Sequence, residues 1–341
     1  MQFIKRAAST LLAVSLGALL AHLSQDLPWV GTHSFASLSS ARAASRIEQR
    51  PELNDTQRSV SKTKAVSLNP IDLSIALGKP FARGKIMTGA TPHRLILFTF
   101  DDGPDLRHTP ALLDALDARG IKAVFFLSAW RIRGQSEAQR AQAEIAIETV
   151  RRGHMVASHG LDHLQLPLLN NEEALEQIVG AQAIFEKVFG QRPWLFRPPG
   201  GAYSDRTTAL LADHGYTTVM WNLGTGDVQV DTPENVLQTW QRVLDRRERE
   251  GNQNGGIILL HDTHTWSVIG FEMIHDELMR RNCKILKRGE ELYDIVDDPR
   301  FFFSPLGKAA PTSKAAPAMP ELALLEARQE RLRKLTEKRC E

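Results

Sequence analysis

From residue 95 onward, short apolar runs alternate with amphipathic stretches of helical length, and this alternation limits the fold more than any other feature. The runs predicted as strands are Leu95–Phe100, Ala123–Leu127, Met155–Ser158, Leu195–Arg197, Thr217–Asn222 and Ile257–His261. The stretches predicted as helices are Thr109–Arg119, Glu137–Arg152, Glu172–Phe189, Asp205–His214, Pro233–Glu250 and Phe271–Arg281. Most of them are followed by a glycine near the expected C-cap: Gly120, Gly153, Gly190, Gly215 and Gly251. Strands and helices in alternation predict an α/β domain built on a parallel sheet.

The predicted strands are apolar throughout instead of alternating in polarity. The run Leu95–Phe98 contains no polar residue, as expected for a strand of a parallel sheet that is buried on both faces. We expect a (β/α) barrel of seven or eight units. A doubly wound open sheet is the alternative, because periodicity does not show whether a sheet closes on itself.

The N-terminal segment has the layout of an export signal. Lys5 and Arg6 precede a stretch, residues 7–23, without Lys, Arg, Asp or Glu, which is the order found in secretory signal peptides. We therefore expect export to the periplasm, the cell envelope or the medium, with residues 1–43 acting as a signal peptide or as an uncleaved membrane anchor. Residues 44–93 are interpreted as a linker or N-terminal extension.

The α/β domain is expected to span residues 94–300. An Ala/Pro-rich linker at 301–320 and a helix at 321–341 are predicted to follow it. The helix either docks on its own domain or binds a partner. The leucines predicted to lie on a related face of the helix are Leu325, Leu332 and Leu335.

Composition argues against two kinds of function. The 42 Lys+Arg and 40 Asp+Glu give a formal net charge of +2, which is too weak a field for nucleic acid as the main partner. A neutral or mixed-charge substrate fits better. Cys283 and Cys340 are too few for a zinc cluster of cysteines. In an exported protein they can pair, but two unrelated thiols are the simpler interpretation.

Polar side chains follow the ends of several predicted strands. These residues are Asp101, Asp102, His159, Arg197, Asp227 and His261. In parallel α/β folds the carboxyl ends of the strands form the active face. We therefore expect these distant positions to meet at one rim of the domain.

Asp102, His159 and His163 have the residue types of a catalytic metal site. The two histidines are four residues apart, so on one helical turn both imidazoles can face a common ion. Together with Asp102 they supply three ligands and leave positions open for water and substrate. A pair of surface histidines and a strand-ending Asp-Gly-Pro turn are the alternative interpretations of the same residues.

Two further segments carry groups suited to hydrolysis. Arg197 can hold a carboxylate, and the glycines that follow Pro199 can present backbone N–H groups to an oxyanion. His261 ends a buried strand and can donate a proton near neutral pH. A surface arginine on a Pro-Gly loop and a satisfied core histidine are the competing interpretations.

Taken together, these segments resemble the polysaccharide deacetylases with the NodB homology domain, the fourth family of carbohydrate esterases. The resemblance covers about Leu95 to Leu292 and keeps five motifs in order. The motifs are Thr99–Pro104, His159–His163, Arg197–Gly201, Asp227 and Leu259–His261.

This resemblance implies a distorted (β/α) barrel of about seven units. It also implies a hydrolase that removes N-acetyl groups from the sugars of a polysaccharide such as peptidoglycan or a chitin-like glycan. Asp102, His159 and His163 would bind a divalent metal, commonly zinc or cobalt. The implied partner is therefore an acetylated polysaccharide, with a membrane contacted only through an uncleaved N-terminal anchor.

The resemblance assigns four catalytic roles in addition. Asp101 would be the general base that activates the attacking water, and His261 would protonate the departing amine. Arg197 would orient Asp101, and Asp227 would orient His261.

The implied substrate pocket departs from the family pattern in places. Its predicted members are Pro199, Gly200, Val228 and Leu259. The family usually has Ser or Thr where Gly160 stands, often Tyr where Gly200 stands and often Trp where Val228 stands. These differences alter the pocket wall but spare the base, the acid and the metal ligands.

Four other functions remain open from the sequence. They are an O-acetyl glycan esterase, a catalytically inactive carbohydrate-binding barrel, a metal-dependent phosphoester hydrolase, and an envelope scaffold that acts through the C-terminal helix.

Overall fold

The computed structural model describes residues 86–251, 253–296 and 322–341. All of them belong to one compact unit, Ala65–Glu341. The predicted signal peptide or anchor and the Ala/Pro-rich linker lie outside the described residues, and the expected domain boundaries stay predictions. Among the described helices, none has the length and apolar character that a membrane crossing requires.

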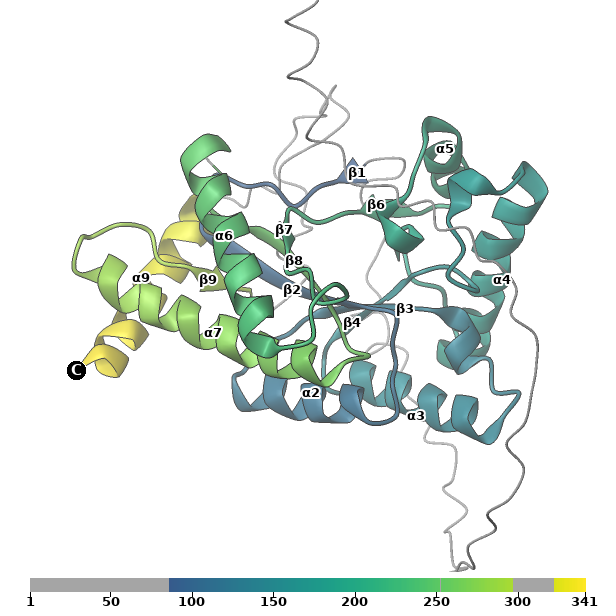
Figure 1. Cartoon of the computed structure of the whole chain (residues 1–341), viewed down its shortest axis with the longest axis horizontal. Coiled ribbons are helices and arrows are strands. Elements are labelled where there is room, and N and C mark those ends of the chain that lie inside the picture. Colours follow the sequence, from purple (N-terminus) through teal and green to yellow (C-terminus); the bar gives the residue numbers. More distant parts are fainter. Residues whose placement is uncertain (1–85, 252, 297–321) are drawn as a thin grey trace, which may run out of the picture. The chain divides into compact units, whose positions relative to one another are not determined.

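The strands form one parallel sheet that curls into part of a barrel (Figure 1). The strands are β1 (Ile86–Met87), β2 (Leu95–Asp101), β3 (Val124–Leu127), β4 (Met155–Ser158), β5 (Leu195–Phe196), β6 (Thr217–Val219), β7 (Leu223–Gly224), β8 (Gly256–His261) and β9 (Asp294–Ile295). Their order is β1-β6-β5-β4-β3-β2-β8-β7, and β9 pairs with the start of β2. From β2 the strands β3 to β6 follow in chain order on one side, and the last long strand, β8, pairs with β2 on the other side, as expected for a (β/α) barrel. Among the described strands no ladder joins β7 to β1, so the barrel is distorted.

The central strand β2 is buried along its whole length, and its two faces serve different purposes. Ile96, Phe98 and Phe100 pack outward in a core shared with the helices. Leu95 and Leu97 point inward, into a second cluster formed by the other strands. Since side chains alternate along a strand, Thr99 and Asp101 share the inward face with Leu95 and Leu97.

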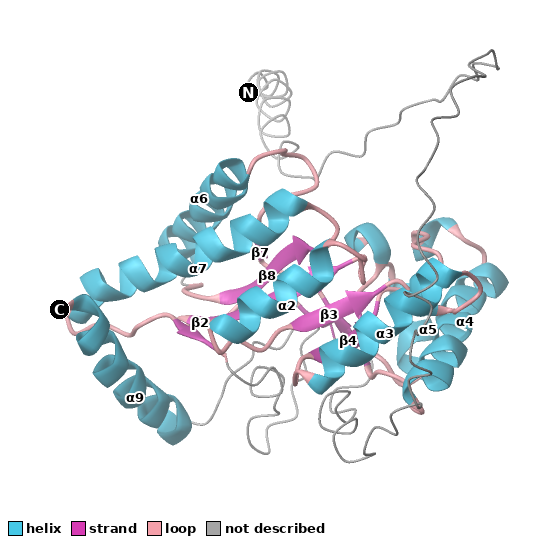
Figure 2. Ribbon diagram, turned by 90° about the horizontal axis from the view of Figure 1, so that it is seen from below, coloured by secondary structure: helices cyan, strands magenta, loops and turns pink. Residues whose placement is uncertain are grey.

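Helices cover the outward face of the sheet (Figure 2). They are α2 (His108–Ala118), α3 (Glu137–Arg151), α4 (Asn171–Phe189), α5 (Asp205–Asp213), α6 (Pro233–Gly251) and α7 (Thr265–Leu286), and α9 (Leu322–Cys340) follows at the C-terminus. Capping boxes start α3, α4 and α5 at Ser136, Asn170 and Ser204. At the end of α4, Gly190 adopts the left-handed conformation with a φ of 75°, as its C-cap position predicts.

The predicted elements are present, and two of them differ from their predicted extent by more than one residue. Helix α7 spans Thr265–Leu286 and so exceeds the predicted range, Phe271–Arg281, at both ends. Strand β6 ends at Val219, because the chain turns away before the predicted end at Asn222. The sequence did not predict β1, β7 and β9, which have two residues each and no readable periodicity.

The C-terminal helix α9 docks on its own domain, one of the two outcomes expected for it. Arg328 makes a two-pronged ion pair with Asp294 at 2.7 and 2.8 Å, and Leu325 is buried. Leu332 packs against the core, and Leu335, although 57 % exposed, lines the same cavity as Leu332, so these two leucines lie on a related face as predicted.

Cys283 and Cys340 form a disulfide, with their Cα atoms 5.7 Å apart. The interpretation of two unrelated thiols is therefore wrong. The pairing depends on α9 packing beside α7, a contact that no local sequence pattern reports.

Candidate active site

The polar residues that follow the strands meet at the carboxyl edge of the sheet, as predicted. Asp101 is the last residue of β2 and lies directly beside His261, the last residue of β8. His159 follows β4 and Arg197 follows β5. Asp227 comes from the loop after β7. A parallel sheet therefore brings five strand ends to one rim.

Asp102, His159 and His163 form a three-residue group whose ligand atoms all lie within 4.8 Å of one another. The Asp102 Oδ1 atom is 3.4 Å from His159 Nε2 and 3.1 Å from His163 Nε2. This buried oxygen makes no hydrogen bond to a described residue. A carboxylate oxygen and two imidazole nitrogens that converge in this way are a suitable ligand set for a divalent cation.

The two histidines converge by a different route from the one expected. Residues 159–163 form a loop and not a helical turn. Gly160 and His163 have positive φ values of 81° and 59°, which turn the chain so that both rings face Asp102. Asp102 itself has a φ of 74°. Such backbone conformations are uncommon for residues other than glycine and cluster at functional sites.

A backbone hydrogen bond sets the tautomer of His159. Its Nδ1 lies 2.8 Å from the carbonyl oxygen of Arg197, so Nδ1–H donates to that carbonyl and the Nε2 lone pair faces Asp102. Burial lowers the pKa of His159, which favours the neutral ring that a metal requires.

Asp101 is held by the guanidinium of Arg197, with a distance of 2.7 Å from Nη1 to Oδ1. The other oxygen of Asp101, Oδ2, lies 3.8 Å from His159 Nε2. Thr99 accepts a second bond from Arg197 Nη1 at 2.8 Å. One carboxylate oxygen is thus fixed, while the other faces the proposed ligand group.

His261 is paired with Asp227. The His261 Nδ1 atom lies 3.0 Å from Asp227 Oδ1, and the backbone N–H of His261 donates to Oδ2 at 2.7 Å. Ser267 and Trp266 also hold Asp227, through its side chain and its carbonyl. Burial alone would lower the pKa of His261, but Asp227 and the charges of the neighbouring aspartates raise it to about 9.

The four predicted pocket residues lie at the same edge. Pro199 and Gly200 form the short helical turn η4 (Pro199–Gly201) after β5. Leu259 stands two residues before His261 and shares its side of β8. Val228 directly follows Asp227 and is half-exposed. Their contact with substrate stays a prediction.

Comparison with known families agrees with this geometry. The polysaccharide deacetylase family model matches residues 88–219, a range that contains the first three motifs. Over this range the chain is similar to the polysaccharide deacetylases. The last two motifs, at Asp227 and His261, follow the matched range and complete the same rim.

The most similar relatives include two deacetylases. The "Probable peptidoglycan-N-acetylglucosamine deacetylase" of Arthroderma benhamiae is 30% identical over 220 residues, which are 64% of this chain and 47% of that protein. The chain therefore spans about half the length of that relative. The peptidoglycan-N-acetylglucosamine deacetylase of Bacillus cereus is 28% identical, over 58% of this chain and 88% of that one.

A solved structure supports the barrel fold of this domain. The chitin deacetylase of Colletotrichum lindemuthianum superposes with a TM-score of 0.51 and 24% identity, over 57% of this chain and 86% of that one. This likeness confirms the distorted (β/α) barrel over the doubly wound alternative.

Asp262 is a buried carboxyl of this domain that was not predicted to be a site residue. It is fully buried, and its Oδ2 accepts the Thr109 hydroxyl at 2.5 Å while Oδ1 has no hydrogen-bond partner among the described residues. A Cβ added to Gly103 would lie 2.1 Å from Oδ2, so the loop after Asp102 rests directly on this carboxyl. Burial raises the pKa of Asp262 to about 7. Adjacency to His261 was the one signal in the sequence.

We expect Asp262 to make stability fall as pH rises from about 4 to 7. The folded state holds the proton up to a higher pH than the unfolded chain does, so ionisation across this window favours unfolding, by roughly 4 kcal/mol in total. Asp262→Asn removes this titration. Urea unfolding of metal-depleted protein at pH 4 and pH 8 should show the variant gaining stability relative to wild type at the higher pH. A difference between the two proteins that does not change with pH would contradict the assignment.

Proposed function

We propose that this chain is a metal-dependent hydrolase that removes N-acetyl groups from the N-acetylated sugars of a polysaccharide. The observation that carries the proposal is that two separate pairs, Asp101 with Arg197 and His261 with Asp227, lie at the same rim as one possible ligand group. Hydrolysis of an amide needs a base for water and an acid for the amine, and each pair suits one of these tasks.

Asp102, His159 and His163 would hold the divalent ion, with zinc as the first candidate and cobalt or another transition metal as alternatives. When bound, such an ion supplies Lewis-acid polarisation of the acetamide carbonyl and makes water easier to deprotonate. The unpartnered Asp102 Oδ1 and the Nε2 atoms that face it are the basis for this assignment.

Asp101 would act as the general base. Arg197 holds Oδ1, so Oδ2 is left to accept a proton from the water that attacks the acetyl carbonyl carbon. The carbon–nitrogen bond then breaks, and the electron pair goes to the sugar nitrogen. A backbone N–H near Gly200 would stabilise the negative charge that develops on the carbonyl oxygen.

His261 would be the acid. With a pKa of about 9 the imidazole is protonated at neutral pH, and Asp227 holds the Nδ1 side of the ring. The proton on Nε2 is therefore available to the departing amine. Water is consumed, and acetate and the protonated amine are formed, because the acetic acid released gives its proton to the amine; the proton taken by Asp101 restores the imidazolium through solvent.

The substrate class and location follow from the relatives and the sequence. Peptidoglycan and chitin-like glycans are the candidate polymers, since the relatives are named as deacetylases of these. Pro199, Gly200, Val228 and Leu259 would line the acetyl pocket. Export to the cell envelope or the medium fits both a polymer substrate and the apolar N-terminal stretch.

The division of labour between the adjacent aspartates can be tested with two variants. Asp102→Ala should lose metal, because one of three ligands is gone. Asp101→Asn should keep metal but lose about a hundred- to ten-thousand-fold in turnover, because an amide cannot accept the proton. The measurements are metal content per chain and the rate of acetate release. An Asp101→Asn enzyme with near-normal turnover would contradict the assigned base.

The role of Asp227 can be tested by the pH profile. Asp227→Asn removes the carboxylate that raises the pKa of His261. His261 should then lose its proton at a lower pH, so the alkaline fall in kcat should move to lower pH. Asp231→Asn, an exposed change in the same loop, is the matched control and should leave the profile unchanged. If kcat fell at the same alkaline pH in Asp227→Asn as in the wild type, His261 would not be an acid whose pKa is set by Asp227.

A further inference from the structure

A cavity far from the candidate active site lies against the C-terminal helix α9. The cavity has a volume of about 350 Å³ and lies between α9, α7, β9 and the turn after α2. Asp294 in its wall pairs with Leu95, the first residue of β2, whereas Asp101 is the last residue of that strand. Six residue steps of about 3.3 Å separate the two ends, or roughly 20 Å. The cavity therefore opens at the opposite edge of the sheet from the deacetylase rim.

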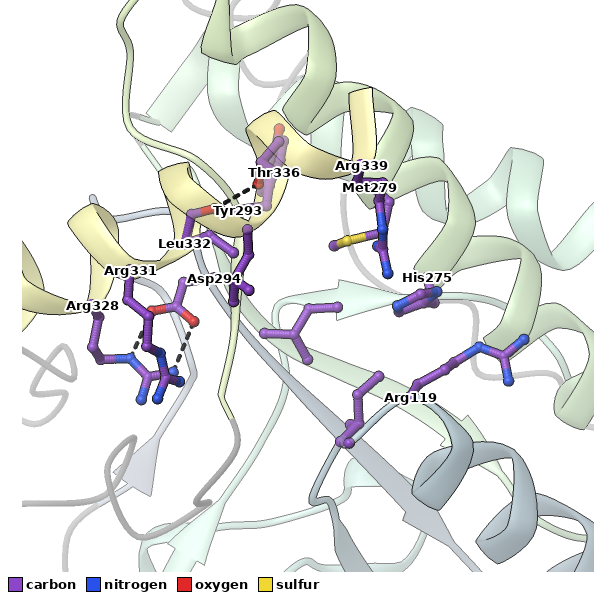
Figure 3. Close-up of a pocket in the computed structure, with 14 residues that line it drawn as sticks. Arg119, His275, Met279, Tyr293, Asp294, Arg328, Arg331, Leu332, Thr336 and Arg339 are labelled. Atoms are coloured by element: carbon purple, nitrogen blue, oxygen red, sulfur yellow. Dashed lines mark hydrogen bonds and ion pairs between the residues drawn. The ribbon is translucent and has the colours of Figure 1, made fainter. Parts of the chain in front are cut away.

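The cavity is lined by basic side chains, and we call it the basic pocket. Its basic members are Arg119, His275, Arg328, Arg331 and Arg339, and its one carboxylate is Asp294. Figure 3 shows Arg119, His275 and Arg339 along one side, with Arg328 and Arg331 on the other. Both oxygens of Asp294 are already engaged by Arg328. The lining thus carries more positive than negative charge.

On the side formed by Arg119, His275 and Arg339, some guanidinium N–H groups donate no hydrogen bond to a described residue. To the described residues, the side chain of Arg119 donates only through Nη1, to Ala115 O at 3.0 Å and to Glu272 at 3.4 Å. Arg339 forms no ion pair with a described residue. His275 is 8% exposed, and burial together with the charges of Arg119 and Arg339 lowers its pKa. The charges of Arg119 and Arg339 therefore both act on the buried ring of His275.

We propose that the basic pocket binds the phosphate group of a small organic molecule. Several guanidinium groups around one cavity match the charge and the multiple acceptor oxygens of phosphate. Ile121, Met279 and Leu332 give the pocket apolar walls that would contact the organic part. The volume lies at the lower end of the range for small-molecule sites.

Helix α9, which forms one wall of the basic pocket, is held in place by contacts within the chain before any ligand binds. Arg339 is adjacent to Cys340, which is bonded to Cys283 of α7. Near the other end of α9, Arg328 is paired with Asp294. Because both ends of the helix are attached, the phosphate would meet prearranged donors, and less ordering free energy opposes binding.

Calorimetric titration of the full chain tests the proposal. Inorganic phosphate and glycerol 3-phosphate are the probes, and the protein is treated with chelator so that phosphate cannot bind a catalytic metal. Arg119→Gln and Arg339→Gln should each weaken binding by roughly tenfold or more, since each removes a charged hydrogen-bond donor. Arg246→Gln, an exposed change on α6, is the control and should bind as wild type does.

A second arm identifies the source of the phosphate. Sedimentation with vesicles of phosphatidylcholine, with and without phosphatidylglycerol, tests a lipid headgroup. Vesicle binding that requires phosphatidylglycerol and is lost in Arg119→Gln and Arg339→Gln supports a headgroup, and binding of the soluble probes alone supports a free organic phosphate. Equal binding by wild type and both pocket variants, or no binding of any probe by folded wild type, would overturn the proposal. Acetate release should be unchanged in the pocket variants, which separates this test from that of the deacetylase site.

Discussion

The buried guanidinium of Arg197 is the interaction on which the rest of the site depends. Taking a charge out of water costs several kcal/mol unless it is paired and fully hydrogen-bonded. Arg197 is 0% exposed. It is satisfied by Asp101, by the carbonyl of Val219 at 3.1 Å and by the ring of Phe126, whose centroid is 4.0 Å away. Its own carbonyl oxygen fixes His159, so one residue positions both the proposed base and a proposed ligand.

Two adjacent carboxylates have different surroundings because the backbone separates them. Asp101 continues the alternation of β2 and points inward, toward Arg197. Asp102 leaves the strand with a φ of 74° and points to the two histidines. Each negative charge therefore has a different set of positive or metal-binding neighbours, which reduces the repulsion between them.

Much of this arrangement could be predicted from the sequence, and the remainder has physical reasons for being hidden. Buried parallel strands have a strong apolar signal, and the rim residues follow from it. The convergence of His159 and His163 was predicted from helical spacing, but left-handed backbone at His163 achieves it, and one sequence does not reveal such a conformation. The disulfide of α7 with α9 and the burial of Asp262 depend on contacts between segments far apart in the chain.

The most direct test of the deacetylase assignment is to count both products on one acetylated glycan. Metal-depleted and zinc-restored protein would be incubated with peptidoglycan and with chitin oligomers, and acetate and new free amines would be measured together. The account predicts no release without metal, and one new amine for each acetate after zinc or cobalt is restored. Acetate without amine would show O-acetyl ester cleavage instead, and equal release by rigorously metal-free protein would contradict the proposed site.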